Sequence, residues 1–310
     1  MRPAVAISQG DPLGIGPEVV VLALADPRVR AQVDAVVFGD RATLLRAAAL
    51  RGVSLEARVV QVGPSTVRPK PVDAGALALE YVDRAARAVL AREVKSLCTA
   101  PVSKERVALS SPDFVGHTEH LARAASARVA MMLAGPRLRV VLATNHLALA
   151  EVPRRLTAAQ IEFVAGLADR ALRASFGIAA PRIAVCGLNP HAGDGGIFGG
   201  EEATLVAPAI AALRAAGIDA TGPHPADGLF PRALRGDFDA VVALYHDQGL
   251  IPAKLVDFRE TVNVTLGLPF PRTSPDHGTA DDIAWQGKAD PEPMITALLL
   301  AARLAQHQET

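Results

Sequence analysis

Short apolar runs alternate along this chain with longer stretches in which apolar residues recur every three or four positions. The short runs are rich in β-branched residues, as in buried strands, and the longer stretches have the period of a helix. Strands are predicted at residues 4–8, 33–39, 57–62, 96–99, 137–144, 182–187 and 240–244. Helices are predicted from Pro17 to about residue 25, at 41–51, 74–92, 157–175 and 291–306, and after Gly116 and Glu202. Repeated strand–helix units predict an α/β fold with a mostly parallel sheet and helices on both faces.

The stretch 241–283 carries the densest set of polar side chains at a strand end. A buried strand at 240–244 is followed directly by Tyr-His-Asp-Gln-Gly, and the next forty residues add charged and amide side chains between Gly and Pro turns. Ligands bind at the carboxyl ends of strands in α/β sheets. The stretch is therefore predicted to be an active-site segment.

Three histidines follow predicted strands directly: His146, His191 and His246. Because the ends of parallel strands converge, these imidazoles are candidates for one divalent metal site that would suit Zn²⁺, Co²⁺ or Mn²⁺. The alternative is that each is a separate loop or capping residue. His117, at a predicted helix start, is likewise either a functional residue or part of a cap.

Three further features suggest anion binding. Arg272 lies in an apolar, Pro-rich turn at 268–274, which favours an anionic partner over solvent. Residues 277–282 precede a predicted helix and supply either backbone donors for an anion or a cap. The loop at 9–18 is rich in glycine but matches neither the dinucleotide fingerprint nor the P-loop, so a phosphate cradle and a plain tight turn both remain open.

The composition excludes several classes of partner. With 310 residues, half of them hydrophobic, the chain has enough apolar surface for two domains or one large unit. Its net charge of zero gives no electrostatic reason to expect nucleic acid or an anionic membrane. No apolar stretch reaches the roughly 20 residues of a membrane span, and no signal peptide precedes the first strand. With Cys98 and Cys186 in apolar runs, a cytoplasmic protein with buried thiols is expected.

Several motifs occur in an order that resembles one family. They are residues 10–18 (GDPLGIGPE), 116–119 (GHTE), 189–193 (NPHAG), 245–249 (YHDQG), 265–270 (TLGLPF) and 276–280 (DHGTA). Together they resemble the 4-hydroxythreonine-4-phosphate dehydrogenase family of pyridoxal phosphate biosynthesis, including its 4-phospho-D-threonate and 4-phospho-D-erythronate dehydrogenase relatives. The resemblance extends from about residue 7 to residue 288. Residues 277–284 are also similar to the adenine-side loop of isocitrate and isopropylmalate dehydrogenases.

The resemblance implies the two-domain isocitrate/isopropylmalate dehydrogenase-like fold, with the active site in the interdomain cleft. The first domain is expected at 1–125 plus 270–310, and the second, which would carry most of the contact in a homodimer, at 126–269. Asp194 and Asp281 depart from the usual family pattern, since Glu is frequent at the first position and an apolar residue at the second.

The resemblance also implies the roles of individual residues. The metal ligands fall on His146, His191 and His246, with one Zn²⁺, Mg²⁺, Co²⁺ or Mn²⁺ per site shared between the two chains. We expect His246 from one chain and the other two ligands from its partner. The substrate contacts fall on His117, Thr118, Lys254, Asn263 and Arg272, and the NAD or NADP contacts on His277, Gly278, Thr279 and Asp282. Asp247 is the candidate catalytic base.

The implied reaction is a metal-dependent, NAD(P)-linked oxidation of 4-phosphooxy-L-threonine followed by decarboxylation to 3-amino-2-oxopropyl phosphate. The same chemistry on 4-phospho-D-threonate or 4-phospho-D-erythronate is an alternative. Two other classes use the same side chains: a metal hydrolase with three His and an Asp, and a non-catalytic phosphate-binding protein. The second would not need three histidines at strand ends.

Overall fold

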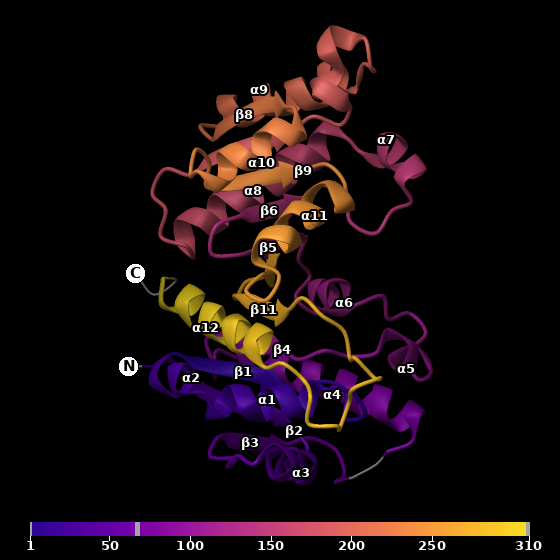
Figure 1. The fold of residues 1–310 in the computed structure, drawn as a ribbon, viewed down its shortest axis with the longest axis vertical. Helices are drawn as coiled ribbons and strands as arrows, with labels where there is room; N and C mark the ends of the chain where they lie inside the picture. Colours follow the sequence, from indigo (N-terminus) through magenta and orange to yellow (C-terminus); the bar gives the residue numbers. More distant parts are fainter. Residues whose placement is uncertain (1, 66–68, 308–310) are drawn as a thin grey trace. The chain divides into compact units, whose positions relative to one another are not determined.

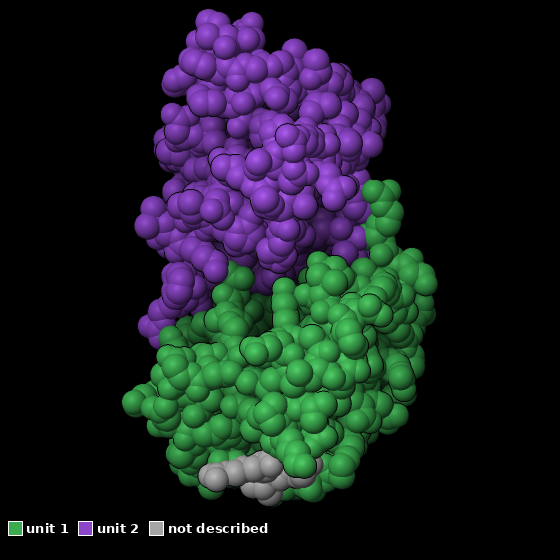
Figure 2. Space-filling model, turned by 90° about the vertical axis from the view of Figure 1, so that its right-hand side faces the viewer, with its two compact units in different colours: residues 1–128, 268–310 green, residues 129–267 purple. Residues whose placement is uncertain are grey.

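The computed structural model describes residues 2–65 and 69–307, drawn in Figure 1. The chain forms two compact units, which Figure 2 colours separately: Met1–Arg128 with Leu268–Thr310, and Val129–Gly267. The sequence placed the domain boundaries at 125/126 and 269/270, and the two units divide at 128/129 and 267/268.

The sheet of unit 1 has the strand order β3-β2-β1-β4-β11, and neighbouring strands are parallel throughout. Its strands are β1 (Ala4–Ser8), β2 (Asp34–Gly39), β3 (Arg58–Gln61), β4 (Ser96–Thr99) and β11 (Arg272–Pro275). Apart from β3, these strands are largely buried, so β1 and β2 read as mainly apolar runs and not as an alternating pattern. β11 (RTSP) is buried although it is polar.

Helices cover both faces of this sheet (Figure 1). They are α1 (Gly16–Ala25), α2 (Pro27–Gln32), α3 (Arg41–Arg51), α4 (Pro71–Leu90), α5 (Lys104–Ala108), α6 (His117–Ala124) and α12 (Glu292–His307). Leu97 belongs to the core cluster beneath α4. The next residue, Cys98, is in register with Thr273, whose hydroxyl donates to the Ala297 carbonyl of α12. Successive strand residues point to opposite faces, so α4 and α12 lie on opposite sides.

The sheet of unit 2 has the order β10-β5-β6-β9-β7-β8. Its strands are β5 (Ala130–Ala134), β6 (Arg139–Leu142), β7 (Arg182–Cys186), β8 (Asp219–His224), β9 (Ala240–Ala243) and β10 (Val262–Leu266). The pairs β10–β5 and β5–β6 are antiparallel, whereas β6, β9, β7 and β8 run parallel. The prediction of mostly parallel sheets is confirmed.

The helices of unit 2 are η1 (Leu149–Glu151), α7 (Val152–Arg155), α8 (Ala158–Ala174), η2 (Pro190–Gly196), η3 (Glu202–Val206), α9 (Ala207–Ala215), α10 (Ala226–Leu234) and α11 (His246–Asp257). Thr157 caps α8 by accepting from the Gln160 amide, as the sequence spacing predicted. Gly249 lets α11 lie directly on the sheet, because a Cβ there would fall 2.7 Å from Val140 and 2.9 Å from Ala243.

Two parts of the 241–283 stretch differ from the sequence-based expectation. Helix α11 begins at His246 itself, although the sequence indicated only Gly and Pro turns after the strand. The helix predicted after residue 282 does not form there, and the segment consists of turns until α12 begins at Glu292. Positive φ angles at Ala280 (43°) and Trp285 (61°) are incompatible with a right-handed helix.

Candidate functional site

Three adjacent parallel strands of unit 2 bring the predicted metal ligands to one edge of the sheet. In the order β6-β9-β7, the carboxyl ends are followed by His146, His246 and His191 respectively. The rings of His146 and His246 lie 5.5 Å apart between centroids. Both line a hollow of about 250 Å³ together with Asn145, Leu147, Leu149, Val152, Tyr245 and Asp247.

Asp247 contacts the His246 ring directly. Its Oδ1 lies 2.7 Å from His246 Nδ1. With Nδ1 donating to the carboxylate, Nε2 keeps its lone pair and can coordinate a metal ion, an arrangement common around metal-bound histidines. The geometry therefore gives Asp247 an orienting contact, and its assignment as the catalytic base stays a prediction.

His191 sits in a left-handed turn. His191, Ala192, Gly193, Asp194 and Gly195 all have positive φ, between 44° and 82°. For non-glycine residues this conformation is strained, and such strain is concentrated at functional sites. Among the described residues, no three His, Cys, Asp or Glu side chains are grouped closely enough to hold a metal ion.

Glu202 holds the start of this turn, a role that the sequence did not indicate. Its Oε1 accepts from the backbone amides of Leu188 (2.8 Å) and Asn189 (2.7 Å), and its Oε2 accepts from Asn189 Nδ2 at 3.1 Å. Burial alone would raise the pKa of Glu202, but the Asn189 and Leu188 donors outweigh it and hold the pKa below its usual value. The carboxylate is thus buried and ionised.

Gln248 ties two of the strand ends together. Its Oε1 accepts from Leu244 N after β9, and its Nε2 donates to the Gly187 carbonyl after β7, both at 2.7 Å. These bonds join the segment that leads to His246 to the segment that leads to His191. The sequence signalled Gln248 only as part of the polar cluster at the strand end.

The two predicted substrate residues of unit 2 lie on separate elements. Lys254 is on α11 and Asn263 is on β10, and both are half-buried. Asn263 Nδ2 contacts the Met131 sulfur at 3.3 Å. Its Oδ1 is buried without a hydrogen-bond partner among the described residues, which leaves an acceptor for a ligand.

Unit 1 brings its substrate candidates together around a buried guanidinium. Arg272, at the start of β11, is only 1% exposed, and its Nη2 donates to the Thr99 hydroxyl. Burial lowers the pKa of Arg272 to about 10. A buried cation next to a neutral hydroxyl gains stability from an anion.

His117, the first residue of α6, lies close to this cation. Burial lowers the pKa of the ring well below its usual value, and the charges of Arg272, His120 and Lys104 add to the effect. His117 Nε2 is buried and has no hydrogen-bond partner in the described chain. Thr118 follows on the same helix, and a Cβ on Gly116 would lie 3.6 Å from Lys104 Nζ. Lys104 is therefore an additional cation at this cluster, which the sequence did not single out.

The predicted dinucleotide residues lie in the turn segment after β11. Gly278 and Asp282 are exposed, and His277 and Thr279 are half-buried. His277 Nδ1 lies 3.0 Å from the Gly278 carbonyl, and its Nε2 is buried without a partner among residues that the structure describes. The segment thus exposes backbone and side-chain polar groups.

The Gly-rich loop of residues 9–18 contacts this segment, and several of its amides have partners inside or outside the loop. Asp11 N donates to the Pro101 carbonyl, Gly14 N to the Asp11 carbonyl and Ile15 N to the Thr279 carbonyl. Leu13 N donates to Asp11 Oδ1. These four amides are not available to a phosphate, which favours a tight turn over a phosphate cradle.

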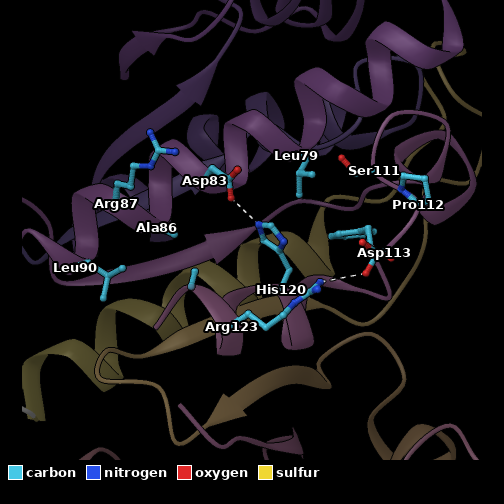
Figure 3. A pocket seen from close by; sticks show the side chains of 12 residues that line it. Leu79, Asp83, Ala86, Arg87, Leu90, Ser111, Pro112, Asp113, His120 and Arg123 are labelled. Carbon is cyan, nitrogen blue, oxygen red and sulfur yellow. Dashed lines mark hydrogen bonds and ion pairs between the residues drawn. The ribbon is translucent and has the colours of Figure 1, made fainter. Parts of the chain in front are cut away.

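A separate hollow of about 580 Å³ lies on unit 1 between α4 and the segment that leads into α6 (Figure 3). Across it, His120 Nε2 lies 2.6 Å from Asp83 Oδ1. Phe114 packs against both His120 and His117, with ring centroids 5.7 Å and 6.3 Å away. None of the predicted site residues lines this hollow.

The remaining sequence-based expectations concern the thiols and the membrane. Cys98 and Cys186 are buried, and burial raises the pKa of each thiol to about 12, so neither is a nucleophile. None of the helices in the described residues is both long and apolar enough to cross a membrane.

Comparison with known proteins identifies relatives over nearly the whole chain. The family model described as "Pyridoxal phosphate biosynthetic protein PdxA" matches residues 28–301. A 4-hydroxythreonine-4-phosphate dehydrogenase of Desulforapulum autotrophicum is 43% identical, with 97% of this chain and 95% of the relative covered. A D-threonate 4-phosphate dehydrogenase of Cupriavidus necator is also 43% identical, with 98% and 97% covered. These relatives are dehydrogenases, so the metal-hydrolase alternative has no support.

Solved structures agree. The crystal structure of a 4-hydroxythreonine-4-phosphate dehydrogenase from Klebsiella pneumoniae has a TM-score of 0.88 and 42% identity, with 99% of both chains covered. A β-decarboxylating dehydrogenase from Thermococcus kodakarensis shares the fold at a TM-score of 0.52 and 15% identity, with 97% of this chain and 82% of that chain covered. The predicted fold class and the predicted dehydrogenase activity are confirmed, and the chain belongs to the PdxA family of pyridoxal phosphate biosynthetic proteins.

Proposed function

We propose that this chain oxidises 4-phosphooxy-L-threonine with a nicotinamide dinucleotide and releases CO₂, giving 3-amino-2-oxopropyl phosphate. One observation carries the proposal: the buried Arg272 guanidinium lies close to His117, whose ring is neutral and whose Nε2 lacks a partner in the described part of the chain. Both groups gain stability when an anionic substrate binds. Thr118 and Lys104 would add a hydroxyl and a second cation.

The residues of unit 2 fit a divalent metal ion, as the family resemblance implies. His146, His191 and His246 would hold one Zn²⁺, Mg²⁺, Co²⁺ or Mn²⁺. Two observations support the fit: the adjacent rings of His146 and His246 in one hollow, and the Asp247 contact that leaves His246 Nε2 as a ligand. A bound ion would act as a Lewis acid that makes the C3 hydroxyl of the substrate more acidic.

The chain's own groups would bind the substrate and accept the proton. Asp247 Oδ2, which no bond within the described residues uses, is the proposed acceptor of the C3 hydroxyl proton. Lys254 would bind an anionic end of the substrate, and Asn263 Oδ1 would accept from a substrate donor. Residues 277–282 would hold NAD⁺ or NADP⁺, which would supply the acceptor for the hydride of C3 as the C3 alcohol is oxidised to a ketone. The β-keto acid would lose its carboxylate as CO₂, and the enol left behind would take up a proton at the former carboxylate-bearing carbon to give the product.

A second substrate is equally supported by similarity. The Cupriavidus necator relative acts, by its name, on D-threonate 4-phosphate and has the same 43% identity as the Desulforapulum autotrophicum relative. D-threonate 4-phosphate, and likewise 4-phospho-D-erythronate, carries a hydroxyl where 4-phosphooxy-L-threonine carries the C2 amine. All three have a phosphate and a carboxylate for the cluster around Arg272.

One assay separates these substrates. Purified protein is incubated with Zn²⁺, Mg²⁺, Co²⁺ or Mn²⁺, with NAD⁺ or NADP⁺, and with each phosphorylated acid in turn, while absorbance of the reduced nicotinamide and release of CO₂ are followed. We expect the highest kcat/KM with 4-phosphooxy-L-threonine. A higher kcat/KM with D-threonate 4-phosphate would make that compound the proposed substrate instead. No turnover with any of the acids would refute the proposed function.

We further propose that the protein is a cytoplasmic homodimer in which the metal site is shared between chains. Unit 2 exposes apolar side chains beside the candidate site, with Ile251 63%, Leu255 84% and Phe258 73% exposed along α11 and its end. Such a row is typical of a surface that a second copy covers. Within the described residues of one chain, no three potential ligands are grouped closely enough to hold a metal ion, which is compatible with ligands from two chains.

A further inference from the structure

The Gly-rich loop and the segment after β11 are fastened together within unit 1 at two points. We propose that Glu18 and the Arg106–Asp281 ion pair are positioning residues that hold residues 277–282 in the conformation that binds the dinucleotide. This inference rests on the proposed function, because it takes these residues to be the dinucleotide site.

The first fastening is a chain of charges from the loop to the segment. Asp11 is fully buried and accepts from Arg106 Nε at 2.7 Å. The same guanidinium donates from Nη1 and Nη2 to the two carboxylate oxygens of Asp281, at 2.6 and 2.9 Å. Arg106 is thus held by Asp11 on one edge and grips Asp281 on the other. A bidentate pair of this kind fixes orientation as well as distance.

The second fastening lies at the far end of the segment. Glu18 is fully buried, and its two carboxylate oxygens accept from Trp285 N at 2.5 Å and from Gly287 N at 3.1 Å. The Trp285 indole Nε1 donates to the Pro12 carbonyl at 3.0 Å. The Arg46 guanidinium lies 4.0 Å from the centre of the same ring. Trp285 is therefore tied through its backbone and its side chain.

The two fastenings lie at or next to strained residues. Ala280 and Trp285 have φ of 43° and 61°, which L-residues adopt only where surrounding contacts impose it. The loop also contacts the segment just before Ala280, where Ile15 N donates to the Thr279 carbonyl at 3.0 Å. A Cβ on Gly14 would lie 2.8 Å from Thr279 Cβ. If one fastening is removed, fewer contacts remain to impose the strained backbone, and the segment should relax.

The test uses Asp281→Ala, since Asp281 is half exposed and its removal leaves no buried cavity. The matched control is Glu292→Ala, because Arg28 also bridges two carboxylates, with bonds of 2.9 and 2.8 Å to Glu292 and a further pair to Asp26. Asp281→Glu keeps the charge and should retain part of the NADH affinity that Asp281→Ala loses. Trp285, the single tryptophan, reports on the segment through quenching of its fluorescence by acrylamide.

We expect Asp281→Ala to weaken NADH binding, measured by calorimetry, about three- to fivefold, as fits the loss of a half-exposed ion pair. KM for the dinucleotide should rise in parallel, KM for the phosphorylated acid and kcat should stay unchanged, and acrylamide should quench Trp285 more strongly. Glu292→Ala should change none of these. NADH affinity unchanged in Asp281→Ala would overturn the positioning role alone. Failure of the unaltered protein to bind both NADH and NADPH would overturn the proposed function and the inference with it.

Discussion

Burial sets the charge state of the side chains around Arg272. The guanidinium stays cationic at neutral pH because even its lowered pKa is about 10, whereas the nearby His117 ring is held neutral. A neutral imidazole can donate to a phosphate from one nitrogen without adding a charge that must be desolvated. The cluster therefore combines the Arg272 cation with a neutral donor.

Replacing Arg272 by Met tests the cation separately from the packing. Met fills a similar volume without charge, so the fold should tolerate it, since a buried ion is often replaced by an apolar residue at no cost. KM for the phosphorylated acid should rise at least about tenfold, as fits the loss of roughly 1.5–3 kcal/mol from a charge-assisted contact. KM for the dinucleotide should change by less than about twofold. The measurement is steady-state kinetics with both substrates varied. If neither KM changed, Arg272 would have no role in substrate binding.

The depressed pKa of His117 predicts a pH dependence of stability. In the unfolded chain the ring titrates near its ordinary value of about 6.5, and in the folded chain it titrates lower, so the unfolded state binds more protons between the two values. The contribution of His117 to the free energy of unfolding is therefore constant above about pH 7.5 and is lost as the pH falls below about 6.5. His117 should account for up to about 1.4 kcal/mol of the loss between pH 7.5 and 5.5.

Urea unfolding curves of the unaltered protein and His117→Gln at both pH values provide the measurement. The variant should lose less stability on acidification than the unaltered protein. Equal losses in the two proteins would mean that the His117 ring titrates normally in the fold.

The turn at 190–196 is the element of unit 2 that depends most on its surroundings. Its run of left-handed residues follows β7 directly, and buried Glu202 accepts from the amides of Leu188 and Asn189 just before the turn. A strained turn persists only when neighbouring bonds determine it. The position of His191 is therefore set by Glu202 as well as by its own strand.

Glu202→Gln should destabilise the protein and weaken metal binding together. The amide still accepts from one or two backbone donors, but its NH₂ group faces Asn189 Nδ2, and the charge assistance is lost. We expect a loss of about 1–3 kcal/mol in the free energy of unfolding and weaker Zn²⁺ retention in competition with a chelating dye. Glu201→Gln is the control, because Glu201 contacts only the Asn189 side chain among the described partners. Unchanged Zn²⁺ affinity in Glu202→Gln would mean that metal binding does not depend on the Glu202 contacts to this turn.

In the proposed shared metal site, assembly of the dimer would decide which histidines come from the same chain. The sequence-based expectation groups His146 with His191 on one chain, whereas the structure puts the His146 ring beside that of His246 within one chain. If the partner supplies the remaining ligand, the adjacent pair would belong to one chain and His191 to the other. The two groupings make different predictions for mixed dimers.

Mixing inactive variants distinguishes the groupings. After reversible dissociation of His146→Ala, His191→Ala and His246→Ala dimers, pairs are recombined and assayed. Random pairing makes about half of the dimers mixed, and each mixed dimer of complementary variants has one intact site, so about a quarter of all sites should recover. Recovery is expected in both mixtures that contain His191→Ala and not in His146→Ala with His246→Ala.

Recovery only in the two mixtures that contain His246→Ala would support the sequence-based grouping instead. No recovery in any mixture, with subunit exchange verified by native mass spectrometry, would mean that all three ligands come from one chain.

The periodic pattern of apolar residues was enough to determine most strands and helices and the α/β class. Strands such as 4–8 and 240–244 are buried on both faces, so each is a short, mainly apolar run, which is typical of a buried strand. Strands β5, β8, β10 and β11 were not predicted from the pattern. β8 and β11 contain Gly or Pro and polar residues, and β5 (AMMLA) has no β-branched residue, so local preference does not favour a strand there.

The candidate site divides in the same way. The sequence alone placed His146, His191 and His246 after strands, because the edge of a parallel sheet is set by chain direction, which the order of elements fixes. Tertiary structure alone decided that the His146 and His246 rings are adjacent, that Arg272 is buried, and that Lys104, Glu202 and Gln248 support the site. These facts depend on which strands are neighbours and on how deeply each side chain is covered. Both result from packing between segments far apart in the chain, which no local pattern encodes.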